Sequence, residues 1–411
     1  MKRVLFVTWD GPDQNYLESL FFPIFAGASA RGFRFDVLQF RWGKSHQSRA
    51  IADAAMSMGI GYRCVPILRH PKALGALASV AWGALQLKHE LASGAVDLVM
   101  PRSILPAQIV KLTRTPLPIV FDADGLPADE RVEFAGWNPH GAFYRVWRDI
   151  EAEAVRRARA VITRTSTAKT VLLGRAGPTA HDERFFVVPN GKDEARFSPG
   201  SADQRTSMRQ ALGIPQSSPW LVFVGSVGAQ YCPDAQLAFY KLVRERVGSA
   251  RLTVLTGHEA EMRRLLAAAG LGPPYVTVSR VAPGDVPGYL AAADLGLAFR
   301  VASFSQRAVS PIKVAEYLLC GLPVLANLGV GDLELQLPHS AGRLLRDLSD
   351  QTLAAAADWF VRDVHPQREQ YRLAARAAGL ASFSLAACAE RYAAACDYAL
   401  APGSSEPRRS R

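Results

Sequence analysis

Strand-like and helix-like segments alternate along the first half of the chain. The buried-strand pattern of residues 3–9 (RVLFVTW) gives way to a helical segment and then to the strand pattern of residues 33–40. Further strand patterns occupy residues 97–102, 117–124 and 160–165, with helix-length segments between them. This β-α-β rhythm predicts a parallel sheet, with right-handed crossovers that place helices on both of its faces.

The same rhythm starts again after a break. Prolines and glycines punctuate a polar stretch at residues 184–220, which we interpret as a linker. A buried strand then begins at Trp220 and ends in glycines, and four more strand patterns follow it, the last at residues 322–327. We therefore predict an α/β fold of two Rossmann-like domains, residues 1–195 and 196–380, with a C-terminal helix and basic tail over residues 381–411.

Ligands of open α/β sheets bind at the carboxyl ends of the strands. The two predicted domains are therefore expected to face each other across a central cleft, with one substrate in each half. Composition supports this size of fold, because 411 residues, nearly half of them hydrophobic, can form more than one core.

Two features of composition bear on where the protein works. No window reaches the roughly 18 consecutive apolar residues of a membrane-spanning helix, and the apolar run after Met1 is too short for a signal peptide. The five cysteines are scattered without a C-x-x-C pair. This spacing predicts neither a disulfide framework nor a zinc site, and it indicates a cytoplasmic protein.

The net charge is +11, and basic residues gather at Arg31–Lys44, at Arg145–Arg159 and in the tail at residues 407–411. Solvated helix faces explain each cluster taken singly, and a positive surface for polyanions is the alternative. No nucleic-acid-binding motif accompanies the charge, so lipid headgroups or phosphates are favoured over nucleic acid. An apolar segment at Tyr16–Phe25, mostly explained by core packing, adds a patch that would suit a membrane or a lipid-linked acceptor.

The stretch SPIKVAEYLLCGLPVLAN combines a helix start, an abrupt stop and a strand. Ser310 is predicted to cap the helix, Pro311 to open its first turn and Gly321 to end it. A helix N-terminus attracts anions, and Lys313 in the first turn indicates a bound phosphate. Glu316, one turn further on, could bind two hydroxyls of a ribose, although an ordinary surface pair with Lys313 explains the spacing equally well.

This stretch resembles the donor-binding segment of nucleotide-sugar-dependent glycosyltransferases with the GT-B fold, particularly the retaining family-4 enzymes. Other stretches resemble the same family in the expected order: residues 186–199, 221–237, 286–299 and 322–337. The match spans nearly the whole chain. It implies two Rossmann-like domains in the GT-B arrangement, with C-terminal helices that pack back toward the N-terminal domain.

The resemblance also implies roles for single residues on the donor side. Glu316 matches the glutamate that holds the donor ribose, and Gly225 and Gly228 match a glycine turn near the phosphates. The helix start that faces the diphosphate and the backbone segment that reads the base match Ser310, Pro311, Ile312, Arg280 and Val281. A glycine after the first strand, Gly11, would let the backbone approach the same diphosphate.

Two positions depart from the family pattern. Ala308 stands where a first glutamate is expected, and Ser226 stands where an arginine is usual. Neutralisation of the leaving diphosphate must then come from other cations, and the candidates are Arg307, Lys313 and Arg300.

On the acceptor side, Asp124 ends a strand at a position where the family often has histidine. Its carboxylate could bind or deprotonate an acceptor hydroxyl, or it could cap the loop. The predicted catalytic set is Lys313, Arg307 and Asp124, with no cofactor. No metal is predicted, because no D-x-D motif lies beside the donor site.

These features predict a hexosyltransferase of polysaccharide biosynthesis that moves a sugar from a UDP- or GDP-sugar to a hydroxyl of a glycan or lipid-linked acceptor. Retention of configuration is implied by the resemblance, and a peripheral position at the inner face of the plasma membrane is expected. The alternatives are a sugar-nucleotide epimerase of the same fold and a non-catalytic basic nucleic-acid-binding protein, which rests on charge alone. A nicotinamide-dependent oxidoreductase would need a G-x-G-x-x-G turn, which GSVGAQ does not supply.

Overall fold

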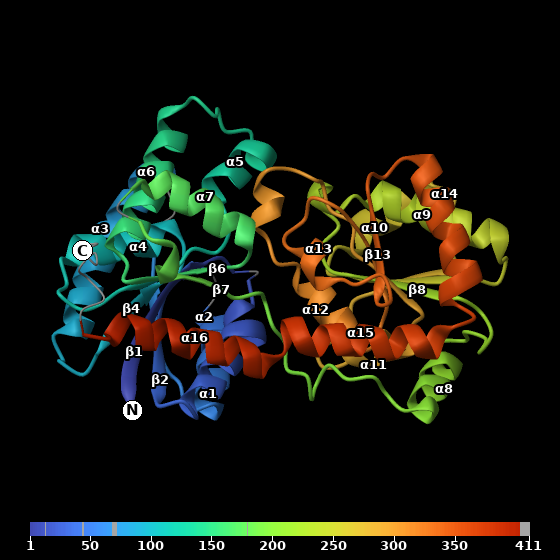
Figure 1. Cartoon of the computed structure of the whole chain (residues 1–411), viewed down its shortest axis with the longest axis horizontal. Helices are drawn as coiled ribbons and strands as arrows, with labels where there is room; N and C mark the ends of the chain where they lie inside the picture. Colours follow the sequence, from blue (N-terminus) through green and yellow to red (C-terminus); the bar gives the residue numbers. More distant parts are fainter. Residues whose placement is uncertain (13, 43–44, 68–71, 179, 403–411) are drawn as a thin grey trace, which may run out of the picture. The chain divides into compact units, whose positions relative to one another are not determined.

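The computed structural model describes residues 1–12, 14–42, 45–67, 72–178 and 180–402 (Figure 1). Lys44 and the basic tail, both parts of the predicted basic clusters, lie outside the described residues. The chain divides into two compact units, of which unit 1 comprises residues 1–189 with 385–411 and unit 2 comprises residues 190–384. The sequence places the corresponding limits at 195/196 and 380/381, and the predicted cleft stays a prediction.

Unit 1 is built on parallel strands. One described sheet has the order β3 (Gly61–Pro66), β2 (Phe33–Arg41), β1 (Lys2–Asp10), β4 (Leu98–Pro101). A second has the order β5 (Val120–Asp122), β6 (Ala160–Thr163), β7 (Phe185–Val187). Single parallel bridges, Val99 to Ile119 and Arg102 to Asp122, join β4 to the second sheet. The parallel sheet predicted for the first half is confirmed.

Helices cover both faces of these strands. They are the π-helix η1 (Leu17–Phe21), α1 (Phe22–Ser29), α2 (Ser45–Ser57), α3 (Lys72–Leu91), α4 (Ile104–Thr113), α5 (Pro127–Ala135), α6 (Ala142–Arg157), α7 (Ser166–Ala176), the short 3-10 turn η2 (Asp182–Arg184) and α16 (Leu385–Leu400). Because the strand order reverses after β3, right-handed crossovers place α1 and α2 on one face and α3 and α4 on the other. Helix α4 packs against α3 and α6.

The C-terminal helix α16 belongs to unit 1 rather than to a separate segment. The resemblance implies this packing of C-terminal helices onto the N-terminal domain. Helix α16 packs against α1 and β6. The phenol ring of Tyr392 lies 6.2 Å from the ring of Phe25. The chain thus returns to unit 1 after completing unit 2.

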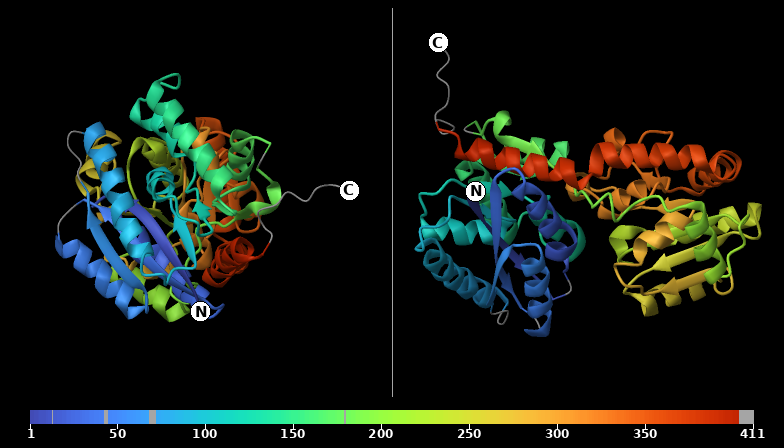
Figure 2. Two further views of the ribbon diagram at one scale, coloured as in Figure 1. Left: turned by 90° about the vertical axis from the view of Figure 1, so that its left-hand side faces the viewer. Right: turned by 90° about the horizontal axis from the view of Figure 1, so that it is seen from below.

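Unit 2 is a second parallel sheet with helices on both faces (Figure 2). Its strand order is β10 (Val276–Ser279), β9 (Arg251–Leu255), β8 (Trp220–Val224), β11 (Leu295–Leu297), β12 (Val324–Asn327), β13 (Gly342–Leu345). The helices are α8 (Ala202–Ala211), η3 (Ala229–Tyr231), α9 (Pro233–Arg246), α10 (Glu259–Ala268), α11 (Val286–Ala292), η4 (Ser305–Ala308), α12 (Ile312–Leu319), α13 (Leu333–Gln336), α14 (Asp350–Trp359), η5 (Phe360–Val364) and α15 (Arg368–Phe383).

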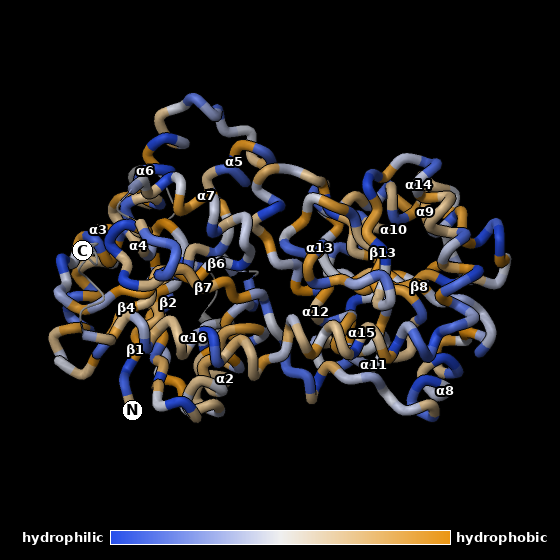
Figure 3. The backbone as a smooth tube through the Cα atoms, viewed as in Figure 1, coloured by the Kyte–Doolittle hydropathy of each residue, from blue (hydrophilic) through white to orange (hydrophobic). Residues whose placement is uncertain are grey.

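Strand β8 shows why this sheet is buried on both sides. Trp220 and Val222 belong to one hydrophobic cluster, whereas Leu221 and Phe223 belong to another. Because successive side chains of a strand point to opposite faces, the two clusters lie on the two faces of the sheet. The hydropathy colouring shows the same concentration of apolar residues along the strands (Figure 3).

The apolar segment at Tyr16–Phe25 is part of the core of unit 1. Phe21, Phe22 and Phe25 are at most 1% exposed. The ring of Phe25 stacks on Phe35 at 4.2 Å. The expectation that this segment leaves an exposed apolar patch is therefore wrong, because the core of unit 1 takes up these aromatic rings.

The arginines of the first predicted basic cluster differ in their exposure. Arg41 is 4% exposed and donates a hydrogen bond to the carbonyl of Pro12 at 2.8 Å. Arg31 and Arg34 each lie close to a carboxylate, those of Glu390 and Asp36, at 3.4 and 3.7 Å. The Arg31 and Arg34 side chains are 43% and 58% exposed, so of these three arginines only Arg41 is withdrawn from the surface.

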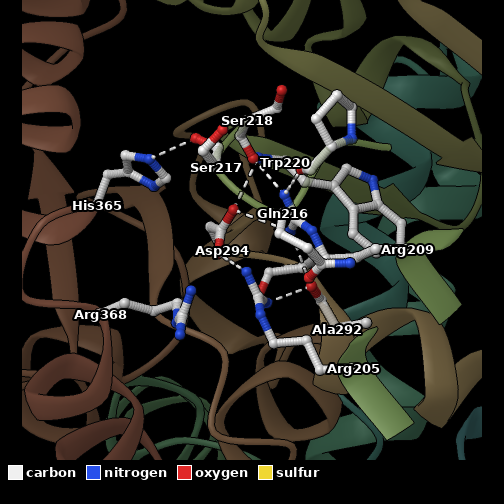
Figure 4. Close-up of polar contacts among 12 residues, drawn as sticks. Arg205, Arg209, Gln216, Ser217, Ser218, Trp220, Ala292, Asp294, His365 and Arg368 are labelled. Atoms are coloured by element: carbon white, nitrogen blue, oxygen red, sulfur yellow. Dashed lines mark hydrogen bonds and ion pairs between the residues drawn. The ribbon is translucent and has the colours of Figure 1, made fainter. Parts of the chain in front are cut away.

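A buried carboxylate links helix α8 to the amino ends of two strands of unit 2 (Figure 4). Asp294, directly before β11, accepts a hydrogen bond from Arg205 at 2.7 Å and lies 3.3 Å from Arg209. It also accepts the backbone N–H of Trp220 at 2.8 Å. Arg209 in turn donates to the carbonyl of Pro215 at 2.9 Å. Helix α8 is thereby joined to the starts of β8 and β11.

We predict that Asp294→Asn destabilises unit 2 by about 3–5 kcal/mol, because it leaves two buried guanidinium groups without their counter-charge. Chemical denaturation measures the change. Asp203→Asn on the same helix is the control, because Asp203 is exposed and should change stability by less than about 0.5 kcal/mol. Equal stabilities of the two variants would contradict a central role for Asp294.

Candidate functional site

The carboxyl ends of the central strands of unit 2 bring together the residues that the sequence singles out. Gly225 follows β8 and has a φ of +123°, a conformation that favours glycine. The Nζ atom of Lys313, in the first turn of α12, lies 3.5 Å from the point where a Cβ would stand on Gly225. The predicted proximity of the glycine turn and the helix start is thus present.

Lys313 is a buried cation in an aromatic setting. Its residue is 8% exposed, and Nζ lies 4.2 Å from the ring centre of Phe223 and 4.5 Å from that of Tyr231. Among the described residues, Nζ has no hydrogen-bond acceptor. Burial, reinforced by the Arg300 charge, lowers the pKa of Lys313 well below its ordinary value, and Glu316 opposes this only in part. An ammonium group in this position favours a bound anion.

Arg300 supplies a second cation at the same strand ends. It is 8% exposed, and its guanidinium lies 4.7 Å from the ring centre of Tyr231, which Lys313 also approaches. Nε donates to the amide oxygen of Gln306 at 2.6 Å, and Nη2 donates to that of Gln230 at 3.2 Å. The sequence reasoning named Arg300 but missed Tyr231 and both glutamines, which no local motif marks.

Glu316 pairs with a lysine other than the one expected. Its Oε1 lies 3.1 Å from Nζ of Lys192, and the two side chains are only 14% and 7% exposed. The alternative of an ordinary surface pair between Lys313 and Glu316 is therefore wrong, because Lys313 is buried and the described ion pair of Glu316 is with Lys192. Sequence reasoning missed Lys192.

The start of α12 differs from the prediction in its cap. The N-cap is Pro311, and no side chain of the described residues caps it. The hydroxyl of Ser310 accepts the backbone N–H of Asn190 at 3.0 Å instead, so Ser310 is not the N-cap. The helix itself begins at Ile312 and ends before Gly321, which has a φ of +67°, so the predicted stop at Gly321 is confirmed.

The other predicted donor-side residues are more dispersed. Arg307 is exposed on η4, beside the fully buried Ala308. Arg280 is exposed and Val281 half-buried, directly after β10. Gly228 stands at the N-cap of η3, with open space around the position of a Cβ. Their donor-side roles stay predictions.

In unit 1, a cluster of charged side chains lies where β1, β4 and β5 end. The carboxylate of Asp124 lies 2.6 Å from Nη2 of Arg102, whose Nη1 lies 3.7 Å from Asp10. Asp124 has a φ of +54°, and burial raises its pKa while Arg102 opposes that effect. Asp124, whose side chain is 32% exposed, thus pairs with the buried Arg102, and its role at the acceptor stays a prediction.

A second ion pair, between Arg164 and Asp122, is buried next to this cluster. Nη2 of Arg164 donates to both oxygens of Asp122 at 2.6 and 2.7 Å, and the hydroxyl of Tyr392 donates to Asp122 at 2.7 Å. Gly11, predicted to leave room for a diphosphate, is buried, and the Trp42 ring lies 3.1 Å from the position of a Cβ. Sequence reasoning missed the contribution of Tyr392, which comes from the far end of the chain.

Two features are absent from the described ranges of the chain. No helix there is both long and apolar enough to cross a membrane. In the same residues, no group of three or more His, Cys, Asp or Glu side chains could hold a metal ion.

Comparison with known proteins finds several sequence relatives. No family model matches the chain. Over 302 residues, or 68% of the chain, it is 28% identical to the D-inositol 3-phosphate glycosyltransferase of Salinispora arenicola. The chain covers 64% of that relative, which is less than two thirds of its length.

Solved structures establish the fold. HepE from Anabaena, in complex with UDP and glucose, matches with a TM-score of 0.70 at 18% identity, covering 97% of this chain and 100% of that one. A putative UDP-N-acetylglucosamine 2-epimerase from Listeria monocytogenes matches with a TM-score of 0.61 at 13% identity, covering 97% and 96%. The chain has the GT-B fold, and the predicted resemblance to GT-B glycosyltransferases is confirmed.

We predict that Lys313→Met raises the melting temperature of the ligand-free protein, by about 2–4 °C for each kcal/mol gained, because it removes a buried charge without an acceptor. The wild type should also gain stability as pH rises toward the ordinary lysine pKa. The unfolded chain binds this proton more tightly than the folded site does, since the folded pKa is the lower one. The variant should lack that part of the pH dependence.

Thermal melts across pH measure both effects. Lys241→Met on α9 is the matched control, because Lys241 is exposed. A lower melting temperature for Lys313→Met than for Lys241→Met would show that the Lys313 ammonium is stabilising in the ligand-free protein.

Proposed function

We propose that this GT-B protein is a glycosyltransferase that moves a sugar from a nucleoside diphosphate sugar, a UDP- or GDP-sugar, to a hydroxyl group. The observation that carries the proposal is the buried ammonium of Lys313, which faces Gly225 and lacks an acceptor among the described residues. With Arg300 it forms a pair of cations at the carboxyl edge of a parallel sheet, the edge where such folds bind ligands. A diphosphate carries one charge per phosphate and would match both.

In this proposal the cations act on the leaving group. Charge on the diphosphate grows as the bond to the sugar breaks, so fixed cations in a dry site stabilise the transition state more than the ground state. Lys313 and Arg300 supply this stabilisation, with Arg307 as the exposed third candidate. Glu316 binds the ribose hydroxyls, the start of α12 faces the diphosphate, and the backbone at Arg280 and Val281 reads the base.

Unit 1 is proposed to bind the acceptor, a glycan or a lipid-linked sugar. Asp124 is the candidate contact for the acceptor hydroxyl, and Arg102 holds its carboxylate in place at 2.6 Å. Attack occurs on the face from which the diphosphate leaves, the departing phosphate takes the acceptor proton, and the sugar keeps its configuration. The chain's own residues then position the two substrates, which is where much of the rate enhancement arises.

An epimerase of the same fold is the alternative, favoured by the likeness to the Listeria protein. The two activities differ in what they need. An epimerase converts the nucleotide sugar when no acceptor is present, whereas a transferase releases the nucleoside diphosphate in step with glycosylation of an acceptor. Assays of UDP- and GDP-sugars with and without acceptor separate the two.

The proposed place of action is the cytoplasmic side of an anionic membrane, reached through α3. This helix exposes three large apolar side chains, Leu77 at 68%, Trp82 at 49% and Leu85 at 59%. Lys88 in the last turn of α3 is exposed. The carboxylate of Glu90 on the same helix pairs with Arg63 at 2.9 Å. Positive charge beside apolar side chains suits an anionic bilayer surface.

The size of this α3 surface argues against a second protein copy as its occupant. Three side chains fall far short of the ~800 Å² that each partner buries in a stable interface. Helix α6 lies two helices away in the same layer and exposes the basic side chains Arg145, Arg156 and Arg157. These belong to the second predicted basic cluster and add to the attraction for anionic headgroups.

We predict that Glu316→Gln weakens binding of the donor nucleotide more than tenfold while leaving the fold intact. It loses charge-assisted hydrogen bonds worth about 1.5–3 kcal/mol each. Titration calorimetry with UDP and GDP gives the affinities. The control is Glu334→Gln on α13, an exposed glutamate of the same unit. Unchanged affinity in Glu316→Gln would remove the ribose role from this residue.

We predict that the protein co-sediments with vesicles rich in anionic lipid at low salt, and that Trp82→Ser weakens this binding roughly tenfold by removing an inserted ring. Binding should fade as salt rises, because screening weakens the Lys and Arg contacts. Leu373→Ser is the matched control, since Leu373 is 74% exposed but lies in unit 2. Equal recovery of wild type and Trp82→Ser with the vesicles would contradict docking through α3.

A further inference from the structure

The two segments where the chain passes between its units lie side by side within unit 2. The chain enters unit 2 at Asn190 and leaves it after Ser384. Between these points, the backbone N–H of Lys192 donates to the carbonyl of Phe383 at 2.9 Å, and Lys192 forms an isolated parallel bridge with Ser384. Lys192 is therefore fixed at its backbone by the returning chain.

The entering segment also contacts helix α12 and the residue Ser310 just before it. Asn190 donates its backbone N–H to the hydroxyl of Ser310 at 3.0 Å and its side-chain amide to the carbonyl of Ser310 at 2.8 Å. Within the helix, Oε1 of Glu316 lies 3.1 Å from the ammonium of Lys192. The ring of Phe197 lies 5.7 Å from the same ammonium.

The ion pair between Glu316 and Lys192 is largely buried. With side chains 14% and 7% exposed, Glu316 and Lys192 are largely removed from water. Removing the cation of such a pair would leave the buried carboxylate without its counter-charge. The described ion pair engages Oε1, and a carboxylate has about four lone-pair sites in all, so Glu316 can still accept hydrogen bonds from two hydroxyl groups.

We propose that Lys192 is a positioning residue for the donor: it holds the Glu316 carboxylate in the orientation in which it accepts the hydroxyls of the ribose. This inference rests on the ribose role proposed for Glu316. Lys192 does not itself contact the nucleotide in this account. Its effect on binding passes through Glu316, so it should depend on the ribose hydroxyls and on the presence of the carboxylate.

The test compares a nucleoside diphosphate with its 2′,3′-dideoxy analogue, using whichever of UDP and GDP binds the wild type. The wild type should prefer the natural nucleotide, and Lys192→Met should lose about tenfold of that preference, a loss typical of removing a partner that orients a ligand-binding group. Lys192→Arg should keep the preference, because it keeps the charge. Lys241→Met, an exposed lysine of α9, should behave as the wild type.

A double-mutant cycle completes the test. In a Glu316→Gln background, adding Lys192→Met should change the affinity no further, because the group through which Lys192 acts is gone. A Lys192→Met variant that keeps the full preference for the natural nucleotide would overturn the inference. Should Lys192→Met fail to fold, Lys192→Gln carries the same comparison. If Glu316→Gln alone keeps the preference, the ribose role of Glu316 fails instead, and the two failures are told apart.

Discussion

The carboxylate of Asp294 fixes the geometry from which the rest of unit 2 follows. It binds two arginines of α8 and the first backbone amide of β8, and all of these groups are buried. With the starts of β8 and β11 held together, the parallel strands end side by side at the opposite edge. Gly225 and Arg300, which follow those two strands, are brought to one place by this register. A contact at the amino ends of β8 and β11 thus determines which side chains meet at their carboxyl ends.

Buried charges are less well paired at the carboxyl ends of these strands than at the amino ends, where Asp294 lies. At Asp294 each buried charge has a partner of opposite sign, whereas Lys313 is surrounded by Phe223, Tyr231 and the like charge of Arg300. A fold under pressure for stability alone would place an apolar side chain there. The energetic conflict is resolved if a ligand brings the missing negative charge. The charge of Lys313, for which the described part of the chain offers no hydrogen-bond acceptor, thus lies in the part of unit 2 with a proposed function.

The sequence predicted those features of the fold that depend on residues close together in the chain. The parallel sheets follow from alternating hydrophobic patterns, and the end of α12 follows from Gly321, whose left-handed backbone a glycine adopts readily. The failures involve partners that are distant in sequence. Serine is a typical N-cap residue, yet the hydroxyl of Ser310 accepts a hydrogen bond from Asn190 instead. Glu316 pairs with Lys192 rather than with Lys313 on its own helix. Nothing short of the tertiary fold specifies those contacts.

The return of the chain to unit 1 has a consequence for biosynthesis. Unit 2 is inserted between β7 and α16, so the ribosome makes all of it before the last helix of unit 1 exists. Until α16 emerges, the buried pair of Asp122 and Arg164 lacks the hydroxyl of Tyr392, and the rings around Phe25 lack a cover. The nascent unit 1 must wait in an incomplete state, while unit 2 has all of its own residues. Synthesis therefore favours an order in which the second half of the molecule folds before the first is finished.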